Sequence, residues 1–405
     1  MYATELDFDA IRHNLLSTWV WDNDGFTVNQ IGHPYQGSFY YVAGRSNGLG
    51  FWSSTMLAAA NSVLWEYTFE TETPSVNDLI VTAFGGASTG EVLHRLYVDA
   101  RVRGLPLAAA FLISPMDAVS DLVSRRGRPS SLGDTGEITA LSLALGPAAE
   151  ARALDNQREG EENGLFPAGF ARFDIVYGEP FSLNSAVPYE HFEFSTQVSW
   201  SPAGYFITLL TDGSIASRPL PAGDGASGSL SLSLHYDFIL GPEIRLSSHA
   251  LGIGVKRSSS VGDDATFSLR AHLAWVMLGG SDYINLTFGP EEEEEGHGQR
   301  RMYDFGTGAC AKVDARMDLG RVGAVSLQYA VYWLYTLPPT VLKPDGSEGH
   351  SLTGLAVASY EVPIARGFSV GITDSFCHKA GWYDDAEDAF EWCNLASLFV
   401  RKRFI

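Results

Sequence analysis

Apolar and polar residues alternate along most of the chain after about residue 137. In the span 229–238, one face carries Ser, His and Asp, and the other carries Leu230, Leu232, Leu234, Tyr236 and Phe238. The spans 171–177, 191–200 and 266–275 repeat this pattern. A period of two over about ten residues is typical of β-strands with two unlike faces.

The alternation predicts about twelve such strands, joined mostly by short turns rich in Gly, Asp and Pro. The predicted spans are 137–146, 168–177, 191–200, 204–213, 229–239, 243–256, 266–287, 301–318, 321–336, 349–362, 367–383 and 389–404. Longer polar connections are expected at Pro147–Pro167, Ala222–Gly228 and Pro290–Arg300.

The chain before about residue 130 contains uninterrupted apolar stretches instead. Ser46–Trp65 has no charge over twenty residues, which is long enough to cross a bilayer as a helix. Its Asn, Ser and Gly residues favour a helix buried against protein over a helix in lipid. Leu105–Ser114 is another apolar stretch, ended by Pro115.

A further helix is expected to begin at Ser75, with Asp78 three residues later as the capping-box acid. Gly86 and Gly90 follow within it, and this small-xxx-small spacing lets another backbone approach closely. We expect the partner to be Ala58–Ala60 of the preceding helix.

Two geometries fit the alternating strands. A soluble barrel or sandwich would turn its aromatic face inward, whereas an outer-membrane barrel would turn it to lipid. The strand lengths and the sparse charge on both faces favour the second. We therefore predict a transmembrane antiparallel β-barrel of about 12 strands, residues 131–405, after an N-terminal α-helical module, residues 1–130.

The composition of the chain excludes some kinds of partner and binding site. Lys plus Arg number 27 and Asp plus Glu 48, so the net charge is −21, and nucleic acid is not an expected partner. Cys310, Cys377 and Cys393 form no C-x-x-C pair, so we expect three unpaired thiols and no zinc or redox motif. No cofactor is predicted.

A barrel of this size is expected to leave a lumen that its own side chains cannot fill, so the helical module is predicted to act as a plug or to dock at the mouth. Gly86 and Gly90, with Arg45 and Glu91, are the predicted packing residues. Charged side chains at the edges of the helices would suit a polar lumen: Arg45, Glu66, Asp78, Glu91 and Arg95.

The N-terminal motifs resemble those of an uncharacterised bacterial family. They are Asn29-Gln-Ile-Gly-His-Pro-Tyr-Gln-Gly-Ser38, Phe39-Tyr-Tyr, Arg45-Ser-Asn-Gly48, Trp65-Glu-Tyr67, Pro74-Ser-x-Asn-Asp-Leu79 and Gly85-Gly-x-x-x-Gly-Glu91. Members of that family carry a domain of unknown function and are predicted outer-membrane proteins. The resemblance covers about residues 15–125 and implies a bacterial envelope location, but no activity.

The two ends of the chain bear on that location. Met1–Asp7 shows neither the basic nor the apolar region of an export signal, which we attribute to the assigned start more than to the family. The penultimate Phe404 resembles the aromatic ending of outer-membrane barrels that the assembly machinery recognises, although Ile405 is the last residue. We expect outer-membrane lipid and that machinery as partners.

One group of residues has the composition of a catalytic site. His33 would be a general base oriented by Glu66 or Asp78, with Ser53, Ser54 or Ser62 as the nucleophile. A structural role explains the same residues and is the interpretation we favour: a His-Pro turn beside a helix start, and carboxylates that cap helices or pair with arginine.

Two further groups suggest ligands less strongly. Glu291–Glu295 would gather divalent cations weakly, but a solvated loop is the favoured interpretation. His235 and His272 fall on the polar faces of separate strands and are expected to face the lumen. We predict no metal site.

The sequence thus predicts an integral outer-membrane barrel with a structural or transport-related role. One alternative is a barrel-embedded lipid-modifying hydrolase or acyltransferase that uses His33 with Glu66 or Asp78 and exposes His33 in a cleft. A second alternative is a soluble β-rich binding protein with a polar exterior and an aromatic interior.

Overall fold

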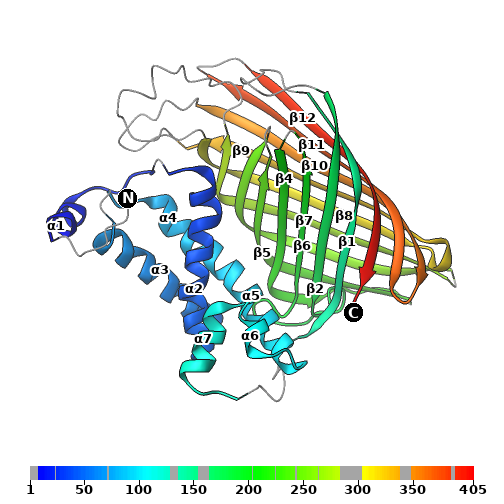
Figure 1. Cartoon of the computed structure of the whole chain (residues 1–405), viewed down its shortest axis with the longest axis horizontal. Coiled ribbons are helices and arrows are strands. Elements are labelled where there is room, and N and C mark those ends of the chain that lie inside the picture. The colour runs from blue at the N-terminus through cyan, green and yellow to red at the C-terminus, as the bar shows by residue number, and fades with distance from the viewer. Residues whose placement is uncertain are drawn as a thin grey trace. The chain divides into compact units, whose positions relative to one another are not determined.

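The computed structural model describes residues 8–22, 24–70, 73–127, 136–153, 164–202, 204–223, 225–241, 244–262, 264–282, 303–337, 348–384 and 388–405. The chain forms two compact units, a helical one that contains the chain up to Thr135 and a β-barrel that begins at Gly136 (Figure 1). The predicted connection Pro290–Arg300, and with it Glu291–Glu295, lies outside the described residues.

The helical unit is built from short and medium helices. They are α1 (Phe8–Leu16), α2 (His33–Ser46), α3 (Phe51–Thr68), α4 (Val76–Ile80), α5 (Gly86–Val102), α6 (Leu107–Ala110) and α7 (Pro115–Val123). Two π-helical segments, η1 (Val28–Gly32) and η2 (Val81–Gly85), run directly into α2 and α5. Within the described part of the chain, no helix has both the length and the hydropathy to cross a membrane.

Local sequence signals explain where these helices begin. The Ser75 hydroxyl accepts a hydrogen bond from the backbone N–H of Asp78 at 3.4 Å, which is the predicted cap. Pro34 lies in the first turn of α2, directly after η1, and its fixed φ is compatible with the helix. The expected His-Pro turn beside a helix start is instead the first turn of α2 itself, because α2 begins at His33 directly after η1.

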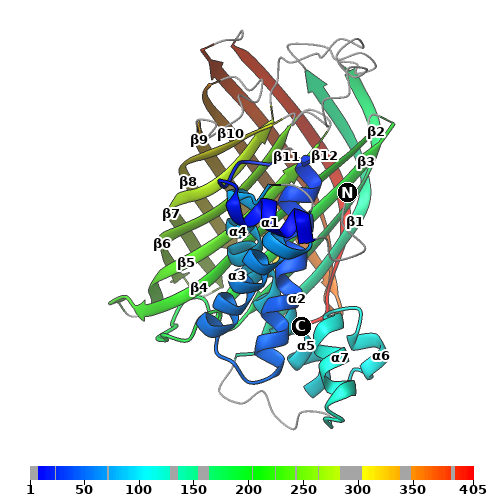
Figure 2. The same cartoon turned by 90° about the vertical axis from the view of Figure 1, so that its left-hand side faces the viewer.

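The second unit is a closed barrel of twelve antiparallel strands, as predicted (Figure 2). The strands are β1 (Ile138–Ala153), β2 (Gly164–Tyr177), β3 (Phe192–Ser201), β4 (Gly204–Pro219), β5 (Ala226–Leu240), β6 (Arg245–Val261), β7 (Ala265–Asp282), β8 (Tyr303–Asp318), β9 (Ala324–Thr336), β10 (Gly349–Ala365), β11 (Phe368–Tyr383) and β12 (Ala389–Arg403).

Each strand pairs with its sequence neighbours, and β1 closes the ring against β12, with Ser142 opposite Arg403. Closure gives every strand in the described part of the chain a hydrogen-bonded neighbour on both sides, so the sheet has no free edge there. Two predicted connections were too long: β1 and β2 together extend from both sides into Pro147–Pro167, and β5 already begins at Ala226.

The two faces of the barrel wall have opposite polarity. In β5, Leu230 and Leu232 are 42% and 39% exposed, whereas the alternate Ser231 and Ser233 are 3% and 0% exposed. Strand β9 repeats this, with Leu327 and Trp333 exposed and the alternate Ser326 and Gln328 half-buried. The barrel therefore turns apolar side chains outward and polar ones into its lumen, the inverse of a soluble β-protein.

Candidate functional site

The helical unit brings His33 together with four carboxylates that are spread over the first 78 residues. They are Asp22 before η1, Glu66 near the end of α3, Glu70 just after α3, and Asp78 in α4. The Nε2 atom of His33 lies 3.3 Å from Oδ1 of Asp78. We call Asp22, His33, Glu66, Glu70 and Asp78 the carboxylate–histidine cluster.

Hydrogen bonds from neighbouring residues hold the carboxylates in place. The backbone N–H of Ser75 donates to Glu66 Oε2 at 2.8 Å, and the Ser75 hydroxyl donates to Asp78. The Asn77 amide also donates to Asp78, at 2.8 Å, and its oxygen accepts the backbone N–H of Asp22 at 3.0 Å. These contacts tie the start of α4 to the end of α3.

The two π-helical segments adjoin the cluster. His33 is the residue directly after η1, and Asp78 precedes η2 by three positions. A π-turn inserts an extra residue into the helical repeat and re-aims the side chains that follow, and such turns are frequent at functional sites. Sequence periodicity gave no sign of either segment.

Burial shifts the protonation of the whole cluster. Desolvation, reinforced by the charge of Glu70, raises the pKa of Glu66 to about 9. Desolvation also raises the pKa of Glu70 to about 7, and desolvation with the charges of Asp22 and Glu66 raises the pKa of Asp78 well above its usual range. The pKa of His33 is lowered by burial, partly offset by Asp22. The cluster resists full ionisation in the absence of a counter-charge.

The predicted nucleophiles do not complete a catalytic triad with His33. Ser53 is exposed, Ser54 lies against Gly44, and Ser62 donates to the backbone oxygen of Asp78 at 3.4 Å. None of the three hydrogen bonds to His33 in the described part of the chain. The His33 side chain is 5% exposed, whereas the hydrolase alternative expects it in an open cleft.

The predicted packing residues lie between α2 and α5. Glu91 is fully buried and accepts hydrogen bonds from Tyr41, Arg45 and Arg95, each at 2.7 Å. Burial alone would raise the pKa of Glu91, but the charges of Arg95 and Arg45 outweigh it and lower the pKa to about 2. These charges lie inside the helical unit rather than along the edges of a hairpin.

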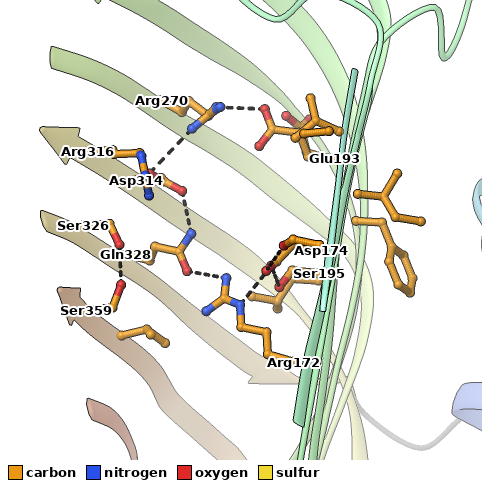
Figure 3. A pocket seen from close by; sticks show the side chains of 18 of the residues that line it. Arg172, Asp174, Glu193, Ser195, Arg270, Asp314, Arg316, Ser326, Gln328 and Ser359 are labelled. Atoms are coloured by element: carbon orange, nitrogen blue, oxygen red, sulfur yellow. Dashed lines mark hydrogen bonds and ion pairs between the residues drawn. The ribbon is translucent and has the colours of Figure 1, made fainter. Parts of the chain in front are cut away.

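The barrel unit has a second concentration of charge, in its lumen. A chain of polar contacts crosses the lumen from β2 to β9, β8, β7 and β3 (Figure 3). Arg172 donates to Gln328 at 3.0 Å, and Gln328 donates to Asp314 at 2.6 Å. Arg270 then pairs with Asp314 at 3.7 Å and with Glu193 at 2.8 Å.

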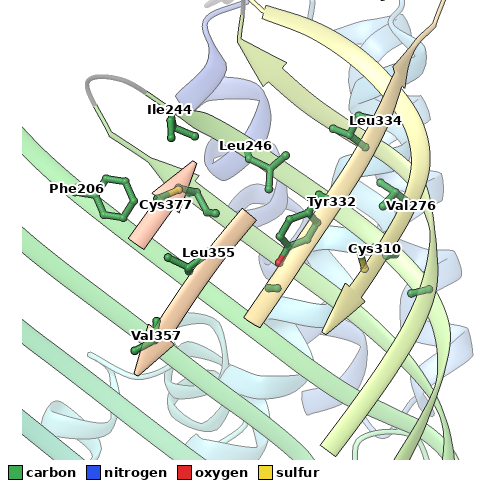
Figure 4. Packing of buried hydrophobic residues seen from close by; sticks show 14 of the residues in the cluster. Phe206, Ile244, Leu246, Val276, Cys310, Tyr332, Leu334, Leu355, Val357 and Cys377 are labelled. Atoms are coloured by element: carbon green, nitrogen blue, oxygen red, sulfur yellow. The ribbon is translucent and has the colours of Figure 1, made fainter. Parts of the chain in front are cut away.

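This chain crosses the barrel because β2 and β9 are five positions apart in a ring of twelve. It borders a cavity of about 520 Å³ whose lining also includes Glu361, Arg401 and Arg403. On another side the cavity meets apolar side chains such as Leu355 and Val357, which belong to a buried cluster around Tyr332 and Leu334 (Figure 4). Side chains of the barrel therefore cross part of the lumen, and the cavity remains beside them.

Two predicted lumenal histidines meet beside this chain. The rings of His235 and His272 are 5.1 Å apart, and Asp212 lies 3.4 Å from His272. Lys256 also pairs with Asp212, at 2.6 Å. Their register could not be read from the sequence, because the barrel stagger is set by bulges and turns rather than by alternation. Cys310, Cys377 and Cys393 are buried and form no disulfide with one another.

Sequence reasoning missed Asp22 and Glu70 in the cluster and the whole lumenal chain. Asp22 and Glu70 stand in irregular segments, where no periodicity relates them to His33. The one available signal was chemical, namely charged residues at lumen-facing positions of strands such as Arg172, Arg270 and Asp314.

The fold and these sites define a class: a closed β-barrel protein with an N-terminal helical domain that holds a buried carboxylate–histidine cluster. Residues 18–116 match the model of a family described as a domain of unknown function, DUF3943. The match confirms the resemblance to an uncharacterised family. Three of the five cluster residues stand in the motifs that carried this resemblance: His33, Glu66 and Asp78.

Comparison with solved structures returns barrels at low identity. The NanC porin aligns at 8% identity and TM-score 0.28, over 63% of this chain and 98% of that chain. The outer membrane phospholipase A from Escherichia coli aligns at 7% and 0.30, over 64% and 92%. The outer membrane channel DcaP of Acinetobacter baumannii aligns at 8% and 0.29, over 67% and 98%. No curated protein matches the chain.

Proposed function

We propose that the protein is an integral outer-membrane β-barrel whose own side chains close its lumen, so that it is not a permanently open pore. The inverted polarity of the barrel wall is the observation that carries the proposal. Large apolar side chains are exposed around the ring, including Leu145, Trp200, Tyr205, Ile253, Leu273, Trp275, Leu327, Trp333, Ile372 and Leu398.

Such a surface is costly in water, where single proteins rarely expose apolar patches of more than a few hundred Å². In a bilayer the same side chains meet lipid tails, and closure satisfies every strand edge. The described strands run from 10 residues in β3 to 18 in β7, which is enough to span the hydrocarbon core when tilted. The soluble alternative expects the opposite sidedness.

The lumenal contacts support the second half of the proposal. Arg172–Gln328 and Arg270–Glu193 join strands on facing parts of the wall, and a cavity of about 520 Å³ lies beside them. Barrel side chains, rather than an inserted helix, therefore close the lumen in this proposal. Transport would require the chain of contacts to open.

Membrane fractionation of the natively expressed protein, followed by a gel of unboiled and boiled samples, tests the location. We expect the protein in the outer membrane, with faster migration before boiling. A soluble protein without that shift would contradict the proposal. A matched pair of variants sharpens the test: Leu327→Asp on the outer face should reduce the folded fraction, whereas Ser326→Asp on the lumenal face should not.

The partners follow from this location and remain proposals: outer-membrane lipid around the wall, and the assembly machinery at the C-terminal strand ending in Phe404. The hydrolase alternative is favoured only by the His33–Asp78 contact. If it were correct, His33→Ala would fold normally and change the lipid composition of the membrane. An unchanged lipid profile would remove it.

A further inference from the structure

We propose that Asp22, His33 and Asp78 bind a divalent transition-metal cation of the Mn²⁺ or Zn²⁺ type in the helical unit. This site is independent of the barrel and of the proposed location. The sequence alone predicted no metal, because the three residues are separated by irregular segments and only the fold brings them together.

The geometry is close to that of a bound ion. One ligand atom from each of the three side chains lies within 4.8 Å of the others, and His33 Nε2 is 3.3 Å from Asp78 Oδ1. Bonds of about 2.0–2.2 Å place two ligands of one tetrahedral ion roughly 3.4 Å apart. The His33–Asp78 pair already has this separation, and the Asp22 oxygen, within 4.8 Å of both, would approach to the same distance around the ion.

One buried side chain beside the carboxylates has unused hydrogen-bonding capacity. The His33 ring is 5% exposed, and its Nε2 atom pairs with Asp78 at 3.3 Å. Asn29 is fully buried and donates to Asp22 at 2.5 Å, while its own Oδ1 atom has no partner among the described residues. Buried polar atoms of this kind are rare without a ligand to satisfy them.

The remaining carboxylates supply charge to the same position. Glu66, Glu70 and Asp78 also bring ligand atoms within 4.8 Å of one another, so Asp78 belongs to both groups. A cation would replace the mutual repulsion of these carboxylates by attraction. Cluster members occur on three helical elements and two connecting segments, so ion binding would hold this part of the unit together.

The donor set selects the kind of ion. An imidazole is a poor ligand for Mg²⁺ and Ca²⁺, which prefer oxygen, and the absence of thiolate at the three positions disfavours soft ions such as Cu⁺. Imidazole with carboxylates suits Zn²⁺ and Mn²⁺. The lumenal group Asp212, His235 and His272 is a weaker candidate, because Lys256 already neutralises Asp212 at 2.6 Å.

The test uses the full-length protein purified in detergent and stripped with a chelator. MnCl₂ or ZnCl₂ is added alone, unbound metal is removed by dialysis, and retained metal is measured by mass spectrometry, with affinity from calorimetry. We expect stoichiometric retention, which His33→Gln and Asp78→Asn each reduce at least about tenfold in affinity. Bound Mn²⁺ should show nitrogen coupling in pulsed electron paramagnetic resonance, and His33→Gln should abolish it.

The matched control is His94→Gln, since His94 is a part-buried histidine of the helical unit that also pairs with a carboxylate, Asp117, at 2.8 Å. It should retain the metal as the unchanged protein does. If His33→Gln does not fold, Asp22→Asn, at a half-buried position, takes its place, and a rise in Tm with added metal is measured on the unchanged protein. The proposal would be overturned if the unchanged protein retained no more metal than the cluster variants do. It would also be overturned if saturating metal did not change the Tm of the unchanged protein.

Discussion

Gly37 and Gly86 bring the backbones of α2 and α5 into direct contact. A Cβ atom on Gly86 would lie 2.6 Å from the carbonyl carbon of Gly37, and one on Gly37 would lie 2.0 Å from the carbonyl oxygen of Thr82. One turn further along α5, a Cβ on Gly90 would meet the Tyr41 ring at 2.7 Å. The glycine spacing indicated such a contact, but it is made with α2 and not with Ala58–Ala60.

We expect Gly86→Leu to separate α2 from α5, because neither backbone has room to yield. Overpacking of this kind costs roughly 1–3 kcal/mol, and more where backbone must move. The free energy of unfolding of the helical unit should fall by at least that amount, measured by thermal unfolding followed by circular dichroism at a helical wavelength.

Gly127→Leu is the matched control, because nothing lies within 4 Å of a Cβ built at Gly127. It should leave the unfolding temperature of the helices unchanged. Equal unfolding temperatures for Gly86→Leu and the unchanged protein would show that the close approach of Gly37 does not constrain the unit.

Glu91 should make the helical unit sensitive to acid. Its folded pKa is about 2 against an ordinary value of 4.5, so the unfolded chain takes up the proton first as pH falls. The stabilisation, on the order of 3 kcal/mol, is therefore complete above about pH 4.5 and lost progressively down to about pH 2. Thermal unfolding measured across this interval should show a falling Tm.

Glu91→Gln should remove this part of the pH dependence and lower the stability at neutral pH, since Arg45 and Arg95 would lose their buried partner. Asp9→Asn, at an exposed position in the first turn of α1, is the control and should keep the acid sensitivity of the unchanged protein. If Glu91→Gln and the unchanged protein lose stability in parallel, other carboxylates cause the acid response.

The barrel could be predicted from the sequence because sidedness is a local property. Successive side chains of each strand lie on opposite faces, as Leu230 and Ser231 do. The face of each side chain can therefore be predicted from the sequence of its own strand, without the positions of the neighbouring strands. The number of strands and most of their boundaries could therefore also be predicted from the sequence. Strand ends were less certain, as at Ala153 and Ala226, where small and polar residues weaken the alternation.

The sites depend on relationships that are not local. His33, Glu66 and Asp78 were chosen for their chemistry, and the fold does place His33 beside Asp78. Asp22 and Glu70 join them only through the paths of the connecting segments. The contact of Arg172 with Gln328 depends on the stagger of the ring, to which strands far apart in sequence contribute.

Gln328 holds the lumenal chain together, because it accepts from Arg172 and donates to Asp314. Gln328→Ala should break the chain and raise ion conductance through the barrel in planar bilayers, from almost none in the unchanged protein. Combining it with Tyr332→Ala, which removes a fully buried ring from the apolar cluster, should raise the conductance further. Trp333→Ala is the control, since its side chain lies on the outer face of the same strand and should leave conductance unchanged. A large open-pore conductance in the unchanged protein, or none in the double variant, would show that lumenal side chains do not control passage.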